Sequence, residues 1–323
     1  MKIWKKTTLS NWPKSVFLGL ALTLTAGTAQ AAITPDGASA AAQKSAVSAA
    51  EGSAVYKKFE HYVSKPASLA TARNYLINHI REVSKSEATV MTLHLENAQK
   101  AHLAAFSEKI YAERIQQALD KAYQDNGYSI EGLMHATTDK AAKALLIEAR
   151  DKGYKLEASE GLYYPVMHYQ GFKQFRSYIN KDIAAYIDLM AVDSNSPIMF
   201  DAAIVVSWDE LIKRAIAMEV FLKQYPKSNR ATAVKQLFAM TQAAVLYGAN
   251  NTPAYDAYSE SGDKISIDPE VRAAYESAVE TDKTDSTLAA RLEKLLALLD
   301  ETDNVFTAEV EQLLEHFMQE ANK

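Results

Sequence analysis

The chain has 323 residues, no cysteine and a formal net charge of −5. The lack of cysteine excludes disulfide bonds, lipid attachment at a cysteine and thiol catalysis, so core burial alone must stabilise the fold. The excess of acids disfavours binding to nucleic acids and to anionic lipids, because both ligands require a basic surface. We therefore expect the partners to be proteins or neutral glycans such as those of the cell wall, or cations.

The N-terminus has the pattern of a secretory signal peptide over residues 1–31. Four lysines precede an apolar stretch from about Val16 to Leu24, which is too short to span a bilayer comfortably. The triplet Ala29-Gln30-Ala31 fits the small-x-small rule, so we expect cleavage after Ala31. Cleavage removes four lysines and no acid, which takes the formal charge from −5 to −9. The sequence thus predicts a secreted protein, associated with the cell envelope, that is not inserted in the membrane after cleavage.

The first half of the mature chain is predicted to be a leader followed by helices. Residues 32–54 are mainly Ala, Ser and Gly, and such a stretch cannot bury enough apolar surface to stay ordered. Apolar residues at helical spacing then predict a helix over residues 69–84 and a second, uninterrupted helix over residues 86–125, paired as an antiparallel hairpin. A further helix over residues 137–153 ends at Gly153, a typical C-terminal cap. Together these helices make up an N-terminal helical hairpin region, residues 55–154.

Residues 155–323 are predicted to be a second helical module with one irregular aromatic insert. Around the insert, the alternating pattern of residues 154–172 fits a small β-hairpin or an extended connection, and Pro165 excludes a long central strand. Ser207 and Glu210 have the capping-box spacing at the start of one helix. We expect helices over residues 172–192, 207–226, 229–251, 268–280, 285–301 and 304–320. The predicted fold class is all-α, built from antiparallel helical hairpins as a bundle or a short solenoid.

Sequence motifs of common catalytic and metal sites are missing or incomplete. There is no HExxH, GxSxG, Walker or GxGxxG motif, so the sequence predicts no metal and no cofactor. Ser261 and Lys264 have the SxxK spacing of penicillin-binding proteins, but they precede an extended stretch rather than lying one helical turn apart. Residues 300–311 partly match the pattern of an EF-hand loop, but the sixth position, which is glycine in that loop, is Val305. We interpret the latter segment as a turn between helices.

The aromatic insert contains the best candidates for a binding site, although its rings have two possible roles. Tyrosine faces stack on sugars and peptide side chains, which makes Tyr163, Tyr164, His168 and Tyr169 the candidate contact residues. The same rings would equally serve as a core that pins an irregular connection to the helices. Glycan hydrolysis needs only two carboxylates across a cleft, and the alternative hypothesis is a cell-wall glycan hydrolase that uses Glu160 with Asp201 or Asp209.

One part of the chain resembles a known helical family. Residues 219–238, EVFLKQYPKSNRATAVKQLF, are similar to the helix-turn-helix of tetratricopeptide-like repeats. The likeness covers about forty residues in all and is carried by Trp208, Leu211, Ala217, Phe221, Tyr225, Pro226 and Ser228. More broadly, residues 155–260 look similar to uncharacterised secreted proteins of Gram-positive spore-forming bacilli, a resemblance that implies no known activity. Helical hairpin modules mainly present grooves to proteins, so we expect a non-catalytic interaction protein.

Overall fold

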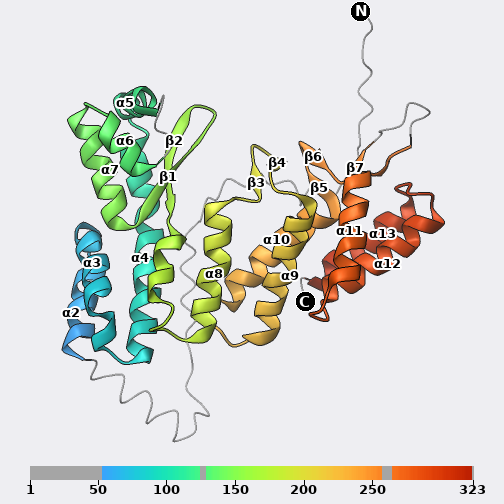
Figure 1. Cartoon of the computed structure of the whole chain (residues 1–323), viewed down its shortest axis with the longest axis horizontal. Helices are drawn as coiled ribbons and strands as arrows, with labels where there is room; N and C mark the ends of the chain where they lie inside the picture. Colours follow the sequence, from blue (N-terminus) through green and yellow to red (C-terminus); the bar gives the residue numbers. More distant parts are fainter. Residues whose placement is uncertain (1–52, 124–128, 257–263, 322–323) are drawn as a thin grey trace, which may run out of the picture. The chain divides into compact units, whose positions relative to one another are not determined.

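A computed structural model describes residues 53–123, 129–256 and 264–321, and all of them belong to one compact unit within Ile33–Lys323 (Figure 1). The predicted signal peptide, nearly all of the predicted leader and Ser261 of the SxxK match lie outside the described residues. The described part of the chain is mostly helical, with short antiparallel strand pairs between the helices. Within it, no helix combines the length and the apolar character that crossing a membrane requires.

The first helices surround the long helix α4. They are α2 (Ala54–Val63), α3 (Leu69–His79), α4 (Lys85–Ile110), α5 (Glu113–Tyr123), α6 (Ile130–Ala136) and α7 (Lys140–Lys152), with short 3-10 turns at Pro66–Ser68 and Ile80–Glu82. Helix α4 packs against α2, α3 and α7. It starts with a complete capping box, in which Ser84 and Glu87 satisfy each other's backbone amides.

The prediction of one uninterrupted helix over residues 86–125 is wrong, because the helix breaks at Tyr111 and Ala112 and α5 starts afresh at Glu113. No proline or glycine marks this break in the sequence. The break leaves the carbonyl of Ile110, at the end of α4, without a helical partner. The side-chain amide of Gln116 in the next helix donates a hydrogen bond of 2.8 Å to this carbonyl. The break lets α5 pack against α6 and α7.

The aromatic insert is a β-hairpin followed by a 3-10 helix. Strand β1 (Tyr154–Ser159) pairs antiparallel with β2 (Leu162–Met167), and Pro165 lies opposite Leu156. The turn residues Glu160 and Gly161 both have positive φ angles, 51° and 78°, as a two-residue type I′ turn requires. The chain continues through the 3-10 helix η4 (Tyr169–Phe175) to α8 (Lys181–Asn195). The helix predicted over residues 172–192 therefore starts later, at Lys181.

The remaining helices follow the sequence prediction closely. They are α9 (Trp208–Gln224), α10 (Ala231–Tyr247), α11 (Pro269–Thr281), α12 (Thr287–Glu301) and α13 (Ala308–Ala321). Three pairs of two-residue strands lie in the connections. The pair β3 (Met199–Phe200) with β4 (Ala203–Ile204) lies between α8 and α9, and the pairs β5 (Gly248–Ala249) with β6 (Thr252–Pro253) and β7 (Tyr255–Asp256) with β8 (Ser266–Ile267) lie between α10 and α11. Helix α9 is central to this part, since it packs against α8, α10, α11 and α12.

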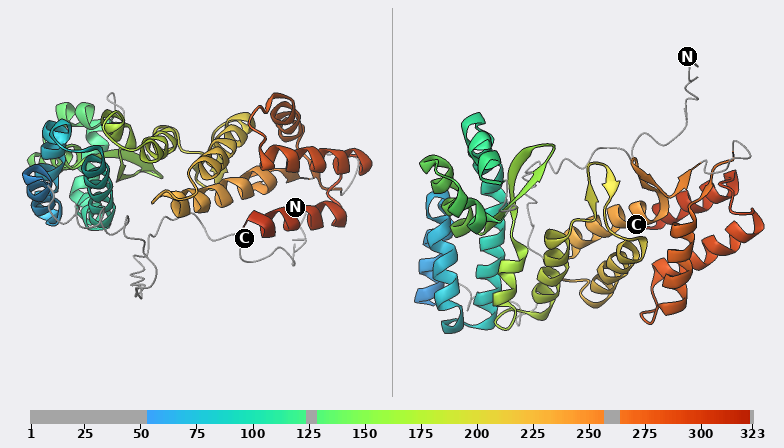
Figure 2. Two further views of the ribbon diagram at one scale, coloured as in Figure 1. Left: turned by 90° about the horizontal axis from the view of Figure 1, so that it is seen from below. Right: turned by 45° about the horizontal axis from the view of Figure 1, so that its top comes forward.

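The tips of hairpins β1–β2 and β3–β4 and the pair β5–β6 point to the same side of the compact unit in Figure 1 and in the right view of Figure 2. The β3–β4 turn is tied to its neighbour, because the Asn251 amide donates a hydrogen bond of 2.7 Å to the carbonyl of Asp201. The Ala202 carbonyl accepts a second bond from the Asn251 backbone amide at 3.0 Å. These two hydrogen bonds join the β3–β4 turn to the β5–β6 turn.

Candidate functional site: the tip of the aromatic hairpin

A small pocket lies at the tip of hairpin β1–β2. Its volume is about 240 Å³, and its walls come from α5 (Asp120, Tyr123), from the hairpin turn with Tyr163, and from Phe200 of the β3–β4 hairpin. Two apolar side chains at these tips remain open to solvent, since Leu162 is 53% and Phe200 is 41% exposed. We call the pocket and these two side chains the hairpin-tip site. Phe200 lines the pocket, and Leu162 lies in β2 directly after the lining residue Gly161. Exposed apolar side chains beside a pocket are compatible with an interaction surface.

The hairpin is held to α5 by a pair of side-chain hydrogen bonds. Gln116 accepts a bond from the Tyr163 backbone amide at 2.8 Å and donates one to the Tyr163 carbonyl at 2.9 Å. The Gln116 side chain thus pairs with both backbone polar groups of Tyr163, as a neighbouring strand would, and joins β2 to α5. The rigid scaffold thus fixes the position of the tip.

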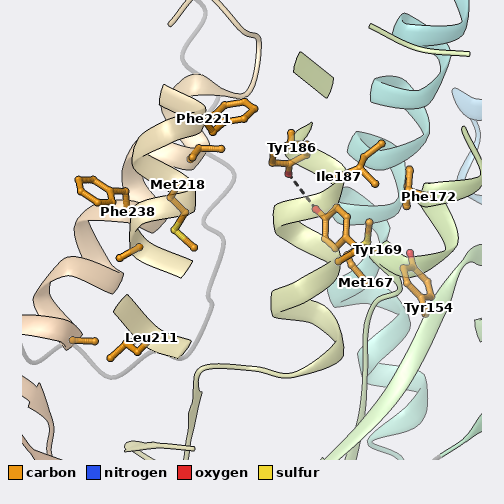
Figure 3. Close-up of a cluster of buried hydrophobic side chains, with 14 of the residues drawn as sticks. Tyr154, Met167, Tyr169, Phe172, Tyr186, Ile187, Leu211, Met218, Phe221 and Phe238 are labelled. Atoms are coloured by element: carbon orange, nitrogen blue, oxygen red, sulfur yellow. Dashed lines mark hydrogen bonds between the residues drawn. The ribbon is translucent and has the colours of Figure 1, made fainter. Parts of the chain in front are cut away.

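Two of the four predicted contact residues are part of the core. Tyr163 is only 3% and Tyr169 only 4% exposed, so the prediction of an exposed surface is wrong for these two rings. Tyr163 still contributes to the wall of the tip pocket. Tyr169 is directed inward from η4 toward Tyr186 of α8, as Figure 3 shows. The large side chains of the insert pack into the core between the helices, which is the second of the two roles that the sequence left open.

The hydroxyl of Tyr169 belongs to a buried polar cluster around Glu96. The Glu96 carboxylate is 3% exposed and accepts hydrogen bonds from the hydroxyls of Tyr169 at 2.7 Å and Tyr186 at 2.6 Å. Arg230 binds the same carboxylate through Nη2 at 2.6 Å, and Lys100 lies at 2.7 Å. This Glu96 cluster joins α4, η4, α8 and the start of α10.

The charges in the cluster compensate one another. Burial by itself would raise the pKa of Glu96, but Lys100 and Arg230 outweigh it and hold the pKa below its ordinary value. Burial, followed by the effect of the neighbouring hydroxyl and carboxylate, raises the pKa of Tyr169 well above its ordinary range. The charged carboxylate of Glu96 is thus neutralised by two cations and hydrogen-bonded by two hydroxyls, which is typical of a structural ion pair.

Tyr164 and His168 are half-buried and remain partly accessible. Burial is the main cause that lowers the pKa of His168, and the positive charges of Lys155 and Arg73 add to it. The pKa of Tyr164 is raised, first by burial and then by Glu157. Neither residue lines the pocket at the hairpin tip.

The three predicted carboxylates lie on three different elements. Glu160 lies in the β1–β2 turn, Asp201 in the β3–β4 turn and Asp209 in the first turn of α9. Only Glu160 lines the tip pocket, where the second carboxylate is that of Asp120. Sequence reasoning missed Asp120, because an exposed acid on the amphipathic helix α5 carries no local signal of a site, and only the fold brings it to the hairpin.

The other segments considered for metal binding have internal partners. In the EF-hand-like segment, Arg272 donates hydrogen bonds to Asn304 at 2.5 Å and to Asp300 at 2.7 Å, so a guanidinium occupies the place between these oxygens. His94 contacts Glu60, and His102 contacts Lys152. No set of three or more metal-binding side chains occurs among the residues that the structure describes. Compared with known proteins, the chain matches no family model, no curated protein and no solved structure.

Proposed function

We propose that this is a secreted, non-catalytic helical protein of the cell envelope that binds a protein partner through the hairpin-tip site. The observation that carries the proposal is the exposure of Leu162 and Phe200 beside a pocket on a fixed hairpin. Secretion, cleavage after Ala31 and kinship with helical proteins of spore-forming bacilli are part of the same proposal and rest on sequence patterns. The tetratricopeptide-like pair α9–α10 and the other helices act in it as a scaffold of helical hairpins.

The chemistry of the site suggests what it binds. A volume of about 240 Å³ lies below the 300–1,000 Å³ typical of pockets for whole small molecules, so it suits one side chain of a larger partner. The walls are aromatic, and the carboxylates of Asp120 and Glu160 stand at the pocket. We therefore expect a partner segment with an apolar side chain flanked by lysine or arginine.

Selection from a displayed random peptide library tests the proposal. Peptides enriched on the purified protein should share an apolar residue next to basic residues. Phe200→Ser should weaken the binding of such a peptide about tenfold, since it removes an apolar contact at the pocket. The matched control is Met240→Ser on α10, because Met240 is 44% exposed and lies outside the pocket. Enrichment of no common pattern, or equal loss in both variants, would contradict the proposal.

The alternative function is hydrolysis of cell-wall glycan. One observation favours it, namely that Glu160 shares a pocket with a second carboxylate, Asp120, and with the rings of Tyr123 and Tyr163. The assay is digestion of purified cell walls by the protein and by its Glu160→Gln variant. Digestion that is lost in the variant would replace the non-catalytic proposal with the hydrolase, whereas peptide binding without digestion would exclude the hydrolase.

A further inference from the structure

A second and larger cavity lies away from the hairpin tip. Its volume is about 580 Å³, and it opens between the first residues of α4, the first turn of α8 and the turn from α9 to α10. It shares no residue with the pocket at the hairpin tip. It is a shallow depression that is wide open to solvent, and its volume is larger than that of the pocket at the hairpin tip.

Hydrogen bonds between its three walls hold the cavity in shape. The backbone amide of Asn180, at the start of α8, donates to the Thr89 hydroxyl of α4 at 2.9 Å. The Ser228 hydroxyl, in the α9–α10 turn, donates to the Asp182 carboxylate of α8 at 2.7 Å. Each wall is thus connected to the next, so that a ligand would meet a preformed site.

Three lysines, one from each wall, line the cavity. Lys85, Lys181 and Lys227 are exposed, and no carboxylate lies within ion-pair distance of their ammonium groups in the described part of the chain. The only acid in the lining is Asp182, which already accepts the Ser228 hydroxyl. The lining therefore has a formal charge of +2 in a chain whose net charge is −5. Like charges gathered in a concave surface focus a positive potential there.

The rest of the lining supplies neutral donors and an apolar wall. The side-chain amides of Asn180 and Gln224 line the cavity and make no hydrogen bond to other described residues. Tyr225 and Pro226 form the apolar part. Charged groups that fix a ligand beside an apolar surface are the usual composition of a site for a small organic ion.

We propose that this lysine cavity binds a small organic anion with two or more carboxylate or phosphate groups. Ammonium groups bind both kinds of oxyanion as point charges, and two such groups on the ligand match the charge of the lining. A cation would be repelled, and a neutral sugar would gain nothing from the positive charge of the lining. The inference is independent of the peptide site, because the two sites have no residue in common.

Isothermal titration of the full chain tests the proposal with defined probes. Succinate and pyrophosphate represent the carboxylate and phosphate ligands, and acetate and glycerol represent a single charge and no charge. We expect succinate or pyrophosphate to bind at least about tenfold more tightly than acetate, and glycerol not to bind. The stronger of the two probes identifies the chemistry of the natural ligand, and either result supports the proposal.

Two triple variants with the same loss of charge locate the binding. Replacement of Lys85, Lys181 and Lys227 by glutamine should weaken the better probe at least about tenfold. The control replaces three exposed lysines outside the cavity, namely Lys143, Lys235 and Lys294. It should change the affinity less than about twofold, because distant surface charges are screened by salt. Equal losses in the two variants, or dissociation constants above about 1 mM for both probes, would overturn the proposal.

Discussion

Removal of the Glu96 carboxylate should destabilise the fold more than removal of a carboxylate from any exposed ion pair. Glu96 receives hydrogen bonds from two tyrosine hydroxyls and from Arg230, and it lies 2.7 Å from Lys100. Glu96→Leu would leave the guanidinium of Arg230, whose side chain is 14% exposed, without its counter-charge. Breaking a buried ion pair from one side costs about 3–5 kcal/mol.

Chemical and thermal unfolding followed by circular dichroism measure this effect. For a chain of this size, 3–5 kcal/mol corresponds to a decrease in Tm of roughly 10 °C. The control is Asp188→Asn, which removes the carboxylate of the more exposed pair with Arg176 and should cost less than about 1 kcal/mol. If Glu96→Leu cost no more than this control, the cluster would not stabilise the fold and our reasoning would be refuted.

The same cluster predicts a dependence on acid. The pKa of Glu96 is lowered in the folded state, so its contribution is fully present above its ordinary pKa, near 4.5. The contribution is lost as the pH falls from there through the folded-state value, because in that range the unfolded chain binds a proton that the folded carboxylate does not bind. Glu96→Gln removes this titration, and its stability should therefore fall less steeply below about pH 4.5 than that of the natural protein.

Three further changes should have distinct effects on stability. Gly153→Ala should lower the free energy of unfolding in urea by at least about 1 kcal/mol more than Gly161→Ala. Both glycines have positive φ, but only at Gly153 would the new Cβ approach another atom closely, the Gln99 Nε2 at 2.5 Å. Equal losses in the two variants would contradict this. Glu219→Ala should lower the free energy of unfolding by roughly 2–3 kcal/mol, since its carboxylate accepts bonds from the first backbone amides of α12 at 2.7 and 3.2 Å. Thermal melts measure that loss, and a Tm shift below about 2 °C would exclude the capping role. Burial raises the pKa of Tyr275. The neutral hydroxyl therefore contributes to the stability of the folded state below about pH 10, and this contribution is lost as the pH rises further. Tyr275→Phe should flatten the decline of Tm between about pH 9 and 11, and an unchanged decline would argue against the effect.

The helix ends that sequence reasoning placed correctly are those set by local chemistry. The Ser207 hydroxyl accepts a bond from the Glu210 backbone amide at 3.2 Å, as the capping spacing predicts. Gly153 ends α7 in the left-handed conformation, with φ 85°. In each case the interacting groups lie within a few residues, so the sequence contains the whole interaction.

The features that sequence reasoning missed depend on distant groups. The break after Ile110 is compensated by Gln116, which in turn holds Tyr163 far along the chain. Tyr169 points inward because Glu96 and Tyr186 meet its hydroxyl. An aromatic residue in an irregular segment carries no local signal of the direction in which its ring points.

The sequence by itself determined that this protein is mainly helical, because apolar periodicity and capping residues act over one or two turns. It also indicated the aromatic insert, for which it left a small β-hairpin and an extended connection open; the structure shows the hairpin, with its turn at Glu160 and Gly161. Only the tertiary structure decided which charges meet, such as Glu96 with Arg230, and which lysines surround a common cavity. Such pairings join residues from separate helices, and their geometry exists only once those helices have packed.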